Sequence, residues 1–182
     1  GMRGPNIQDW SGNLIYGWDK WDSPSATTAR RMLNDLLNLT DVNKINFTGQ
    51  SLGGALAQYA LYDYATQLRQ RHLNDSSQPD FNPSKVTLTT FNGLGGIEAL
   101  TQNRTDFNSS LLSGVDTAHF YVTNDLASRL GGGNLNGAGH EYLLDFTKAN
   151  DQGIRLVRAD STHIALDFAS AHRIELGFYR GF

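Results

Sequence analysis

The sequence contains no cysteine, which excludes disulfide bonds and thiolate metal sites. It also contains no run of about 18 apolar residues, the length that a membrane-spanning helix needs, so we expect no transmembrane segment. Charged residues make up only 18% of the chain, and 15 Lys and Arg are outnumbered by 18 Asp and Glu. This slightly acidic balance disfavours nucleic acid and anionic membranes as partners. A charged fraction below the usual quarter and 19 glycines favour a loop-rich, extracellular protein, although the sequence does not decide the cellular location.

Recognisable metal and nucleotide motifs are absent as well. No pair of histidines has the H-x-x-x-H spacing of zinc sites, and no calcium-binding D-x-[DN]-x-[DN]-G loop is present. A glycine-rich stretch at residues 131–139 lacks the spacing of phosphate-binding loops, and we interpret it as a flexible connection. We therefore expect neither a metal nor a cofactor.

A chain of 182 residues is long enough for one domain, so we expect residues 1–182 to fold as a single unit. Strand-like and helix-like segments alternate over its first two thirds, which predicts a parallel sheet covered by helices. The periodicity predicts helices at 25–39, from the small-residue run at 53–57 to about 72, at 161–179 and within 92–113, and strands at 44–49, 85–91, 118–123, 140–145 and 154–159.

The most informative motif is Gly49-Gln50-Ser51-Leu52-Gly53, which fits the pattern G-x-S-x-G. It lies where a predicted strand ends and a predicted helix begins, so the serine hydroxyl is expected on a sharp, strained turn at the carboxyl edge of a sheet. We expect glycine at both ends of the motif because a side chain at Gly49 or Gly53 would collide with the neighbouring strand or helix. The alternative interpretation is a glycine-rich turn with an inert serine.

A neutral serine hydroxyl becomes an effective nucleophile only when an imidazole takes its proton and a carboxylate orients that imidazole. In folds with this motif the order along the chain is Ser, then Asp or Glu, then His. Asp125 directly follows a predicted strand and fits that order. Asp106, Asp116 and Asp145 fit less well because of their places in the predicted elements. Asp125 could alternatively cap a helix at residues 126–130.

Two histidines follow the last predicted strand, and either could serve as the base. His163 comes four residues after Ala159 and His172 comes thirteen residues after it. The greater separation allows a loop to return from the strand toward Ser51, but spacing alone does not choose between the two. The remaining histidines precede Asp125 or begin a strand, and so fit less well: His72, His119 and His140.

Taken together, these segments resemble the class 3, fungal-type lipases of the α/β-hydrolase group. The stretch at residues 48–57 is similar to the family's nucleophile turn, although Gln50 stands where that family usually has His. Further similar segments are the strand at 86–93, the Asn124-Asp125 segment at 121–130, the Glu-Tyr strand at 140–145 and the histidine segment at 171–179.

The resemblance implies an α/β-hydrolase-like fold, with a mostly parallel central sheet flanked by helices and a C-terminal strand hairpin. It implies a serine carboxylic-ester hydrolase that acts on acylglycerols or related lipid esters, at a lipid–water interface or on small soluble esters. Ser51 would be the nucleophile and Asp125 the orienting carboxylate. The residues after the family's histidine favour His172 over His163 as the base.

The resemblance weakens near the N-terminus. Arg3 and Gly4 are similar to a family segment that supplies the second donor to the oxyanion hole, but Pro5 stands where Thr or Ser is expected. Proline has no N–H and no hydroxyl, so the donors would be the Leu52 N–H and Asn6. The strand expected before Arg3 is also nearly missing, which implies an N-terminally shortened fold. The alternative hypothesis is therefore a catalytically inactive or truncated domain that binds or scaffolds.

All three tryptophans, Trp10, Trp18 and Trp21, fall within twelve residues. In the lipases that the chain resembles, this region forms a lid that opens at lipid surfaces, a role that suits amphipathic aromatic rings. The alternative is that these rings cover the core beside the first predicted helix. Both interpretations remain open at the level of sequence.

Overall fold

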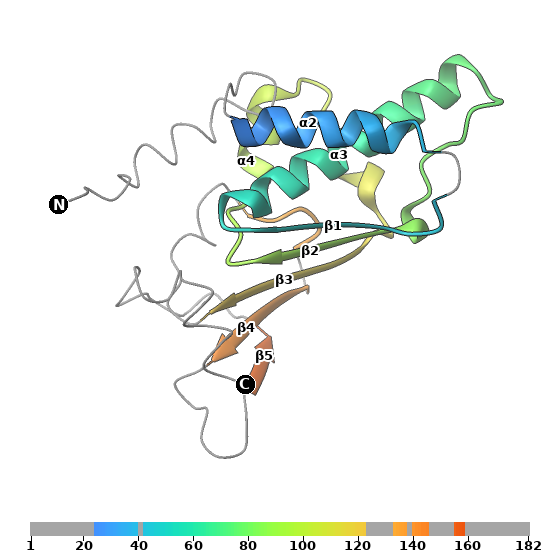
Figure 1. Ribbon diagram of the computed structural model, residues 1–182. Coiled ribbons are helices and arrows are strands. Elements are labelled where there is room, and N and C mark those ends of the chain that lie inside the picture. Colours follow the sequence, from blue (N-terminus) through green and yellow to red (C-terminus); the bar gives the residue numbers. More distant parts are fainter. Residues whose placement is uncertain (1–23, 40–41, 123–132, 138–139, 146–154, 159–182) are drawn as a thin grey trace.

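The computed structural model describes residues 24–39, 42–122, 133–137, 140–145 and 155–158. Strands and helices alternate along these segments (Figure 1). The elements are α2 (Pro24–Leu37), β1 (Ile45–Gln50), α3 (Leu52–Asn74), the 3-10 turn η2 (Pro83–Lys85), β2 (Val86–Phe91), α4 (Ile97–Asn103), the 3-10 turn η3 (Ser109–Leu112), β3 (Asp116–Val122), β4 (Glu141–Asp145) and β5 (Arg155–Arg158).

The five strands form one sheet in the order β1-β2-β3-β4-β5. The first four strands run parallel, and β5 pairs antiparallel with β4 as the second strand of a hairpin. Gln50 and Phe91, the last residues of β1 and β2, lie in register with Phe120 of β3 and with Tyr142, the second residue of β4. The prediction of an α/β protein with a mostly parallel sheet is confirmed, and so is the C-terminal hairpin.

The predicted segments agree closely with the observed ones. β1 begins and ends one residue later than predicted, and β2 begins one residue later but ends where predicted. β3 begins two residues before the predicted start. α2 ends two residues before the predicted end, and the predicted variable helical region contains the short helix α4 and the turn η3. The predicted C-terminal helix at 161–179 lies outside the described residues.

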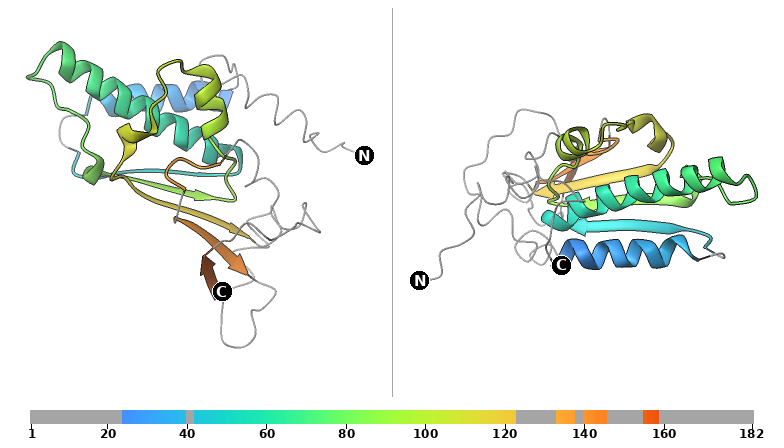
Figure 2. Two further views of the ribbon diagram at one scale, coloured as in Figure 1. Left: turned by 180° about the vertical axis from the view of Figure 1, so that it is seen from behind. Right: turned by 90° about the horizontal axis from the view of Figure 1, so that it is seen from above.

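Helices α2, α3 and α4 all lie on the same side of the sheet (Figures 1 and 2). α3 packs directly on β1 and β2, and Leu61 and Ala65 of this helix are fully buried with Leu88 of β2. α2 rests mainly on α3, into which it buries Leu33 and Leu37, two residues one helical turn apart. The main core is therefore the layer between α3 and the first strands.

The opposite face of the sheet carries a row of stacked aromatic rings. Phe91, Phe120 and Tyr142 occupy opposing positions on β2, β3 and β4. Their ring centroids are 5.6 and 5.2 Å apart, with interplanar angles of 15° and 24°. Such cross-strand aromatic pairs stabilise a sheet and favour one register of its strands. The first ring of the row, Phe91, lies opposite Gln50, the residue that precedes Ser51.

The glycine-rich stretch does not behave as the sequence suggested. In its described part, residues 133–137, the side chains of Asn134 and Leu135 are buried, and Leu135 is fully inaccessible to solvent. The stretch lies over β3, where the Leu135 carbonyl accepts a hydrogen bond from His119 and the Asn136 carbonyl accepts one from Thr117. The interpretation as a flexible connection is wrong for these residues, because they cover part of a strand as a helix would.

Gln58 of α3 joins this stretch to the rest of the core. Its amide nitrogen donates to the Leu94 carbonyl and to Asn134 Oδ1, each at 3.0 Å. Its amide oxygen accepts from the Leu135 N–H at 2.8 Å and the Gly96 N–H at 3.2 Å. A fully buried amide that uses both its donors and its acceptor satisfies backbone groups which would otherwise be buried without partners.

Among the described residues, no helix is both long enough and apolar enough to cross a membrane.

We expect Gln58→Leu to lower the free energy of unfolding by at least about 3 kcal/mol, because several buried polar groups lose their partner at once. Gln70→Leu on the exposed part of the same helix is the matched control and should change it by less than about 0.5 kcal/mol. Urea denaturation of both variants measures the difference. Equal effects of the two substitutions would contradict the structural role assigned to Gln58.

Candidate active site

Ser51 lies between the last residue of β1 and the first residue of α3, at the carboxyl edge of the sheet. Its backbone angles are φ 54° and ψ −125°, a combination that residues with a Cβ atom rarely adopt. The other two non-glycine residues with positive φ in the described chain are asparagines, which tolerate it more readily. The prediction of a sharp, strained strand-to-helix turn at this serine is confirmed.

Three backbone hydrogen bonds hold Ser51 in this conformation. Its N–H donates to the Phe91 carbonyl at the end of β2, at 3.1 Å. Its carbonyl accepts from the Gly54 N–H at 2.9 Å and from the Leu94 N–H at 3.0 Å. The serine is thus fixed by its own helix and by the loop that follows the neighbouring strand. Strain of this kind costs about 1–3 kcal/mol and persists only where the surroundings impose it.

The tight turn requires glycine at positions 49 and 54; the motif predicted the first of these correctly but placed the second at Gly53. A Cβ atom on Gly49 would lie 2.0 Å from the Gly53 carbonyl oxygen, and one on Gly54 would lie 2.6 Å from the Gly93 Cα. A Cβ atom on Gly53 would meet nothing within 4 Å. The expected collision at Gly53 is therefore wrong, because that position faces open space.

Leu52 is the first residue of α3 and directly follows the serine. The first N–H groups of a helix have no partner within the helix, and the helix dipole adds partial positive charge at this end. This 23-residue helix therefore provides a favourable place for negative charge next to Ser51. The predicted second donor, Asn6, lies outside the described residues.

Asn92 is a structural residue at this edge whose role the sequence did not reveal. It is fully buried, has φ 44°, and directly follows β2. Its N–H donates to the Phe120 carbonyl at 2.7 Å, and its side-chain oxygen accepts from the Val122 N–H at 2.8 Å. Asn92 thus ties the end of β2 to the end of β3. Its place in an Asn-Gly pair indicated a turn, but the contact across strands depends on the folded sheet.

Several residues singled out from the sequence lie outside the described residues. This holds for the predicted carboxylate and both predicted bases, for the N-terminal segment and for the tryptophans: Asp125, His163, His172, Pro5, Asn6, Trp10, Trp18 and Trp21. The structure describes Ser51 and Leu52, and their positions next to each other on the strand-to-helix turn agree with the prediction.

The strand that leads to Asp125 ends at the same edge as Ser51. Val122, the last residue of β3, precedes Asp125 by three residues. Of the less suitable acidic residues, Asp116 opens β3 and so lies at the opposite edge of the sheet, while Asp145 ends β4, one strand farther from Ser51. The topology therefore agrees with the order of preference among these acidic residues.

None of the three histidines in the described part of the chain is placed to serve Ser51. His72 lies near the far end of α3, about 30 Å away at 1.5 Å per residue. His140 precedes β4, which is three strands from β1, or about 14 Å. His119 is only 1% exposed, and both of its ring nitrogens are engaged within the core.

The tautomer of His119 follows from its partners. A carbonyl can only accept, so Nε2 carries the hydrogen that is donated to the Leu135 carbonyl at 2.9 Å. Nδ1 then accepts from the Thr90 hydroxyl at 2.8 Å. Burial lowers the pKa of His119 below its ordinary value of 6.5, and this effect outweighs the Leu135 carbonyl and the nearby Glu141 carboxylate, which raise it. His119 is therefore a neutral structural residue.

No cluster of three or more potential metal ligands occurs among the residues that the structure describes.

No protein-family model, curated protein or solved structure matches the chain. The functional argument therefore depends on the motif and on the geometry around Ser51.

The two glycines of the motif give a matched pair of variants. We expect Gly49→Ala to lower the free energy of unfolding by more than about 2 kcal/mol, because its Cβ atom would overlap a backbone carbonyl. Gly53→Ala should leave it unchanged or raise it by up to about 1 kcal/mol, because alanine favours the helix and meets no neighbour. Thermal and urea denaturation provide the comparison, and a larger loss at Gly53 would contradict this geometry.

His119 predicts a specific dependence of stability on pH. Because its pKa is lowered in the folded protein, the unfolded chain binds a proton at pH values where the folded chain does not. The contribution of His119 to stability is therefore complete above its ordinary pKa of 6.5 and decreases as the pH falls below that value. We expect His119→Gln to flatten the pH dependence of the free energy of unfolding in this range. An unchanged profile would show that His119 does not titrate on unfolding.

Proposed function

We propose that this protein is a serine carboxylic-ester hydrolase with an α/β-hydrolase-like fold of the class 3 lipase type. The single observation that carries the proposal is the backbone conformation of Ser51, together with its position between a parallel strand and a long helix. Strained backbone at a serine in this position is the hallmark of a nucleophile turn. The strain has a purpose in such enzymes, since it holds the hydroxyl at the exposed edge of the sheet.

In the first half of the proposed reaction, the Ser51 hydroxyl oxygen attacks the carbonyl carbon of an ester. Its proton passes to the imidazole of His172, with His163 as the alternative base, while Asp125 orients the ring and stabilises its charged form. The Leu52 N–H and Asn6 stabilise the negative charge that develops on the carbonyl oxygen. The imidazolium then gives its proton to the leaving alcohol, which departs and leaves an acyl group on Ser51.

In the second half, the imidazole takes a proton from a water molecule, whose oxygen attacks the acyl carbon. Collapse of the second tetrahedral intermediate releases the carboxylic acid, and the proton returns to the Ser51 oxygen. The choice of base is supported by the positions of the other histidines, since His72, His119 and His140 all lie away from Ser51 or are engaged in the core.

We propose acylglycerols or related lipid esters as the substrate class. The support is the resemblance of the motif segments to class 3 lipases, along with the cluster of three tryptophans that would suit a lipid–water interface. Pro5 cannot supply the donor that the resembling enzymes have at this position, so the second donor would have to come from Asn6. Complete loss of one such donor lowers turnover by about 10²–10³-fold. We therefore propose an active enzyme whose turnover is lowered by at most this factor.

The test combines covalent labelling with turnover. A fluorophosphonate probe should label the wild-type protein at Ser51, and mass spectrometry identifies the modified residue. Hydrolysis of p-nitrophenyl butyrate should fall by at least about 10³-fold in Ser51→Ala, because the attacking oxygen is removed. Alanine has a Cβ atom as serine does, so the strain at these backbone angles is the same in the variant. Circular dichroism checks that the variant remains folded.

The matched control is Ser113→Ala, which removes the hydroxyl of an exposed serine. It should leave both labelling and turnover unchanged. A wild-type protein that is folded but neither labels nor hydrolyses esters would contradict the proposal and favour a binding or scaffold domain. The variants His172→Ala and His163→Ala identify the base, since only the correct one should abolish labelling of Ser51.

A further inference from the structure

Asparagine followed two residues later by serine or threonine, with any residue except proline between them, is the acceptor sequence for N-linked glycans. The chain contains five such sequences, about twice the number that its Asn, Ser and Thr contents predict by chance. They begin at Asn38, Asn46, Asn74, Asn103 and Asn108. The structure describes both the asparagine and the hydroxyl side chain in three of them, those at Asn46, Asn74 and Asn108, and all of these side chains are exposed.

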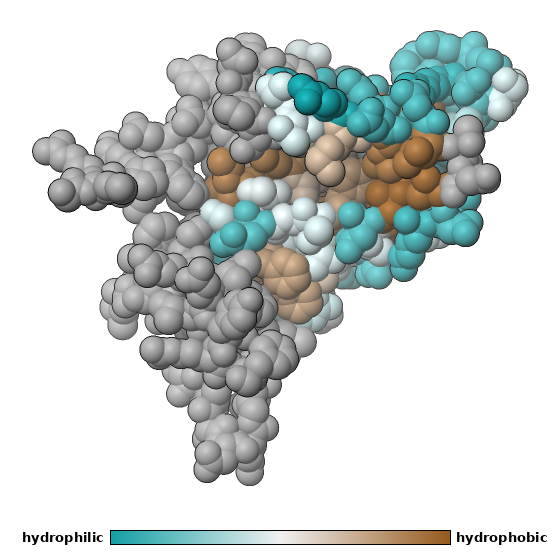
Figure 3. Space-filling model, viewed as in Figure 1, coloured by the Kyte–Doolittle hydropathy of each residue, from teal (hydrophilic) through white to brown (hydrophobic). Residues whose placement is uncertain are grey.

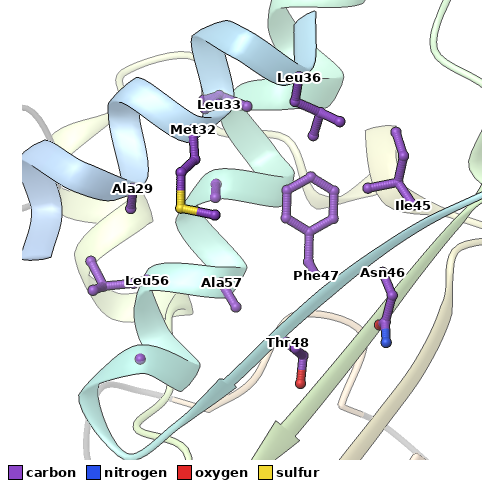
Figure 4. A pocket seen from close by; sticks show the side chains of 12 residues that line it. Ala29, Met32, Leu33, Leu36, Ile45, Asn46, Phe47, Thr48, Leu56 and Ala57 are labelled. Carbon is purple, nitrogen blue, oxygen red and sulfur yellow. The ribbon is translucent and has the colours of Figure 1, made fainter. Parts of the chain in front are cut away.

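The acceptor sequence at Asn46 lies within the sheet. Asn46 is the second residue of β1, opposite Thr87 of β2, and it accepts a hydrogen bond from the Thr87 hydroxyl at 3.0 Å. Figure 4 shows Asn46 and Thr48 pointing away from Phe47 and from the helices. A strand that is paired in a sheet keeps its backbone extended and cannot bend into the cleft of a modifying enzyme. This acceptor sequence is therefore closed once the sheet has formed.

The acceptor sequence at Asn74 carries a negative charge. Asn74 is the last residue of α3, and Asp75 stands between it and the hydroxyl of Ser76. Hydrogen bonds from Ser77 lower the pKa of the Asp75 carboxyl, so this group is ionised at neutral pH. The glycan donor is a lipid pyrophosphate, an anion that the Asp75 carboxylate repels. Asn74 is thus a poorer acceptor, although the end of α3 and the loop after it are exposed and hydrophilic (Figure 3).

Asn108 differs from both because it lies in a surface turn between α4 and β3, directly before η3. Its side-chain oxygen accepts two hydrogen bonds from Ser110, one from the backbone N–H at 3.0 Å and one from the hydroxyl at 2.7 Å. The turn thus brings the hydroxyl of the acceptor sequence to its amide. Among the residues that the structure describes, no hydrogen bond engages the amide nitrogen, the atom to which a glycan is joined.

The backbone of this turn is anchored to α3. The Asn108 N–H donates to the Tyr62 hydroxyl at 3.0 Å, and that hydroxyl donates to the Asp106 carbonyl at 3.3 Å. The rings of Tyr62 and Phe107 pack with their centroids 5.1 Å apart, and Leu112 at the end of η3 is fully buried. The exposed Asn108 side chain therefore extends from a fixed base, and a glycan on it requires no change in the core.

The position of Tyr62 also separates this turn from Ser51. Tyr62 lies eleven residues along α3 from the serine, which is about 16 Å at 1.5 Å per residue. In the view from above, α4 and η3 lie on the other side of α3 from α2 (Figure 2). The apolar band between α2 and β1 therefore lies across α3 from Asn108 (Figure 3). A glycan at Asn108 would leave both the serine edge of the sheet and this apolar band uncovered.

We propose that Asn108 is an N-glycosylation site of this protein. An oligosaccharyltransferase forms a bond between Asn108 Nδ2 and the anomeric carbon of an oligosaccharide carried on a lipid pyrophosphate. The bond from that carbon to the pyrophosphate oxygen breaks, the lipid pyrophosphate leaves, and the amide nitrogen gives up one proton. Because this transfer takes place in the secretory pathway, the proposal also assigns the chain to that pathway. It does not depend on the chemistry of Ser51.

The chain contains a natural control for this site. Asn82 accepts the same two hydrogen bonds from Ser84, from the N–H at 3.0 Å and from the hydroxyl at 2.7 Å, and both side chains are exposed. The residue between them is Pro83, which excludes this sequence as an acceptor. The two turns share their side-chain hydrogen bonds and differ in the acceptor sequence, so Asn82 should remain unmodified.

The test is to secrete the full chain from yeast behind a signal sequence. Peptide N-glycosidase in heavy-oxygen water converts each glycan-bearing asparagine to a labelled aspartate, which peptide mass spectrometry locates, and a digest without the enzyme corrects for spontaneous deamidation. We expect the label at Asn108 and none at Asn82. Ser110→Ala removes the required hydroxyl and should reduce the label at Asn108 by at least about tenfold, whereas Ser110→Thr should retain it.

The matched control is Ser109→Ala, which removes a neighbouring exposed hydroxyl but keeps the acceptor sequence, so the label should be unchanged. If Ser110→Ala is not secreted, Asn108→Gln is compared with the wild-type protein on a gel, where it should lack the mass of one glycan. Circular dichroism checks that each protein is folded. A folded wild-type protein without the label at Asn108 would overturn the proposal, even if Asn46 or Asn74 were labelled. Undiminished labelling in Ser110→Ala would overturn it as well.

Discussion

The carbonyl of Ser51 is the point on which this structure depends most. One oxygen accepts hydrogen bonds from the Gly54 N–H of the following helix and from the Leu94 N–H of the loop after β2. These bonds form only because Gly49 and Gly54 let the backbone of strand, helix and neighbouring loop come into direct contact. The sheet edge, the long helix and the serine are thus placed by a single backbone junction.

Much of this arrangement could be predicted from local sequence patterns. The strand at Ile45–Gln50, the helix after Ser51 and the strand at Val86–Phe91 follow from alternation, small residues and a β-branched run, all of which act over a few residues. The position of the serine on a strained turn was also predictable, because the motif combines two glycines with a change of periodicity. All of these patterns depend on interactions between residues that are close together in the sequence.

The features that escaped prediction depend on contacts between distant segments. Gln58 gave no sign of its role, because its partners come from two loops more than thirty residues away. The glycine-rich stretch seemed mobile from composition, yet Leu135 is buried over β3. The need for glycine at position 54 instead of 53 depends on how closely the loop at Gly93 approaches the helix. Spacing along the chain did not choose between His163 and His172 for the same reason, since it does not specify which imidazole reaches a hydroxyl.

The described part of the connection between β3 and β4 is anchored chiefly by polar groups. Gln58, His119 and Thr117 bond to its backbone, and Leu135 is the only large apolar side chain in it. Separating this segment from the core would therefore expose mainly polar surface, unlike the separation of α2 from α3. Exposure of polar surface lowers the heat capacity, whereas exposure of apolar surface raises it. The two contacts should accordingly respond differently to temperature. Cooling should weaken the packing of α2 on α3 more than the attachment of the segment between β3 and β4.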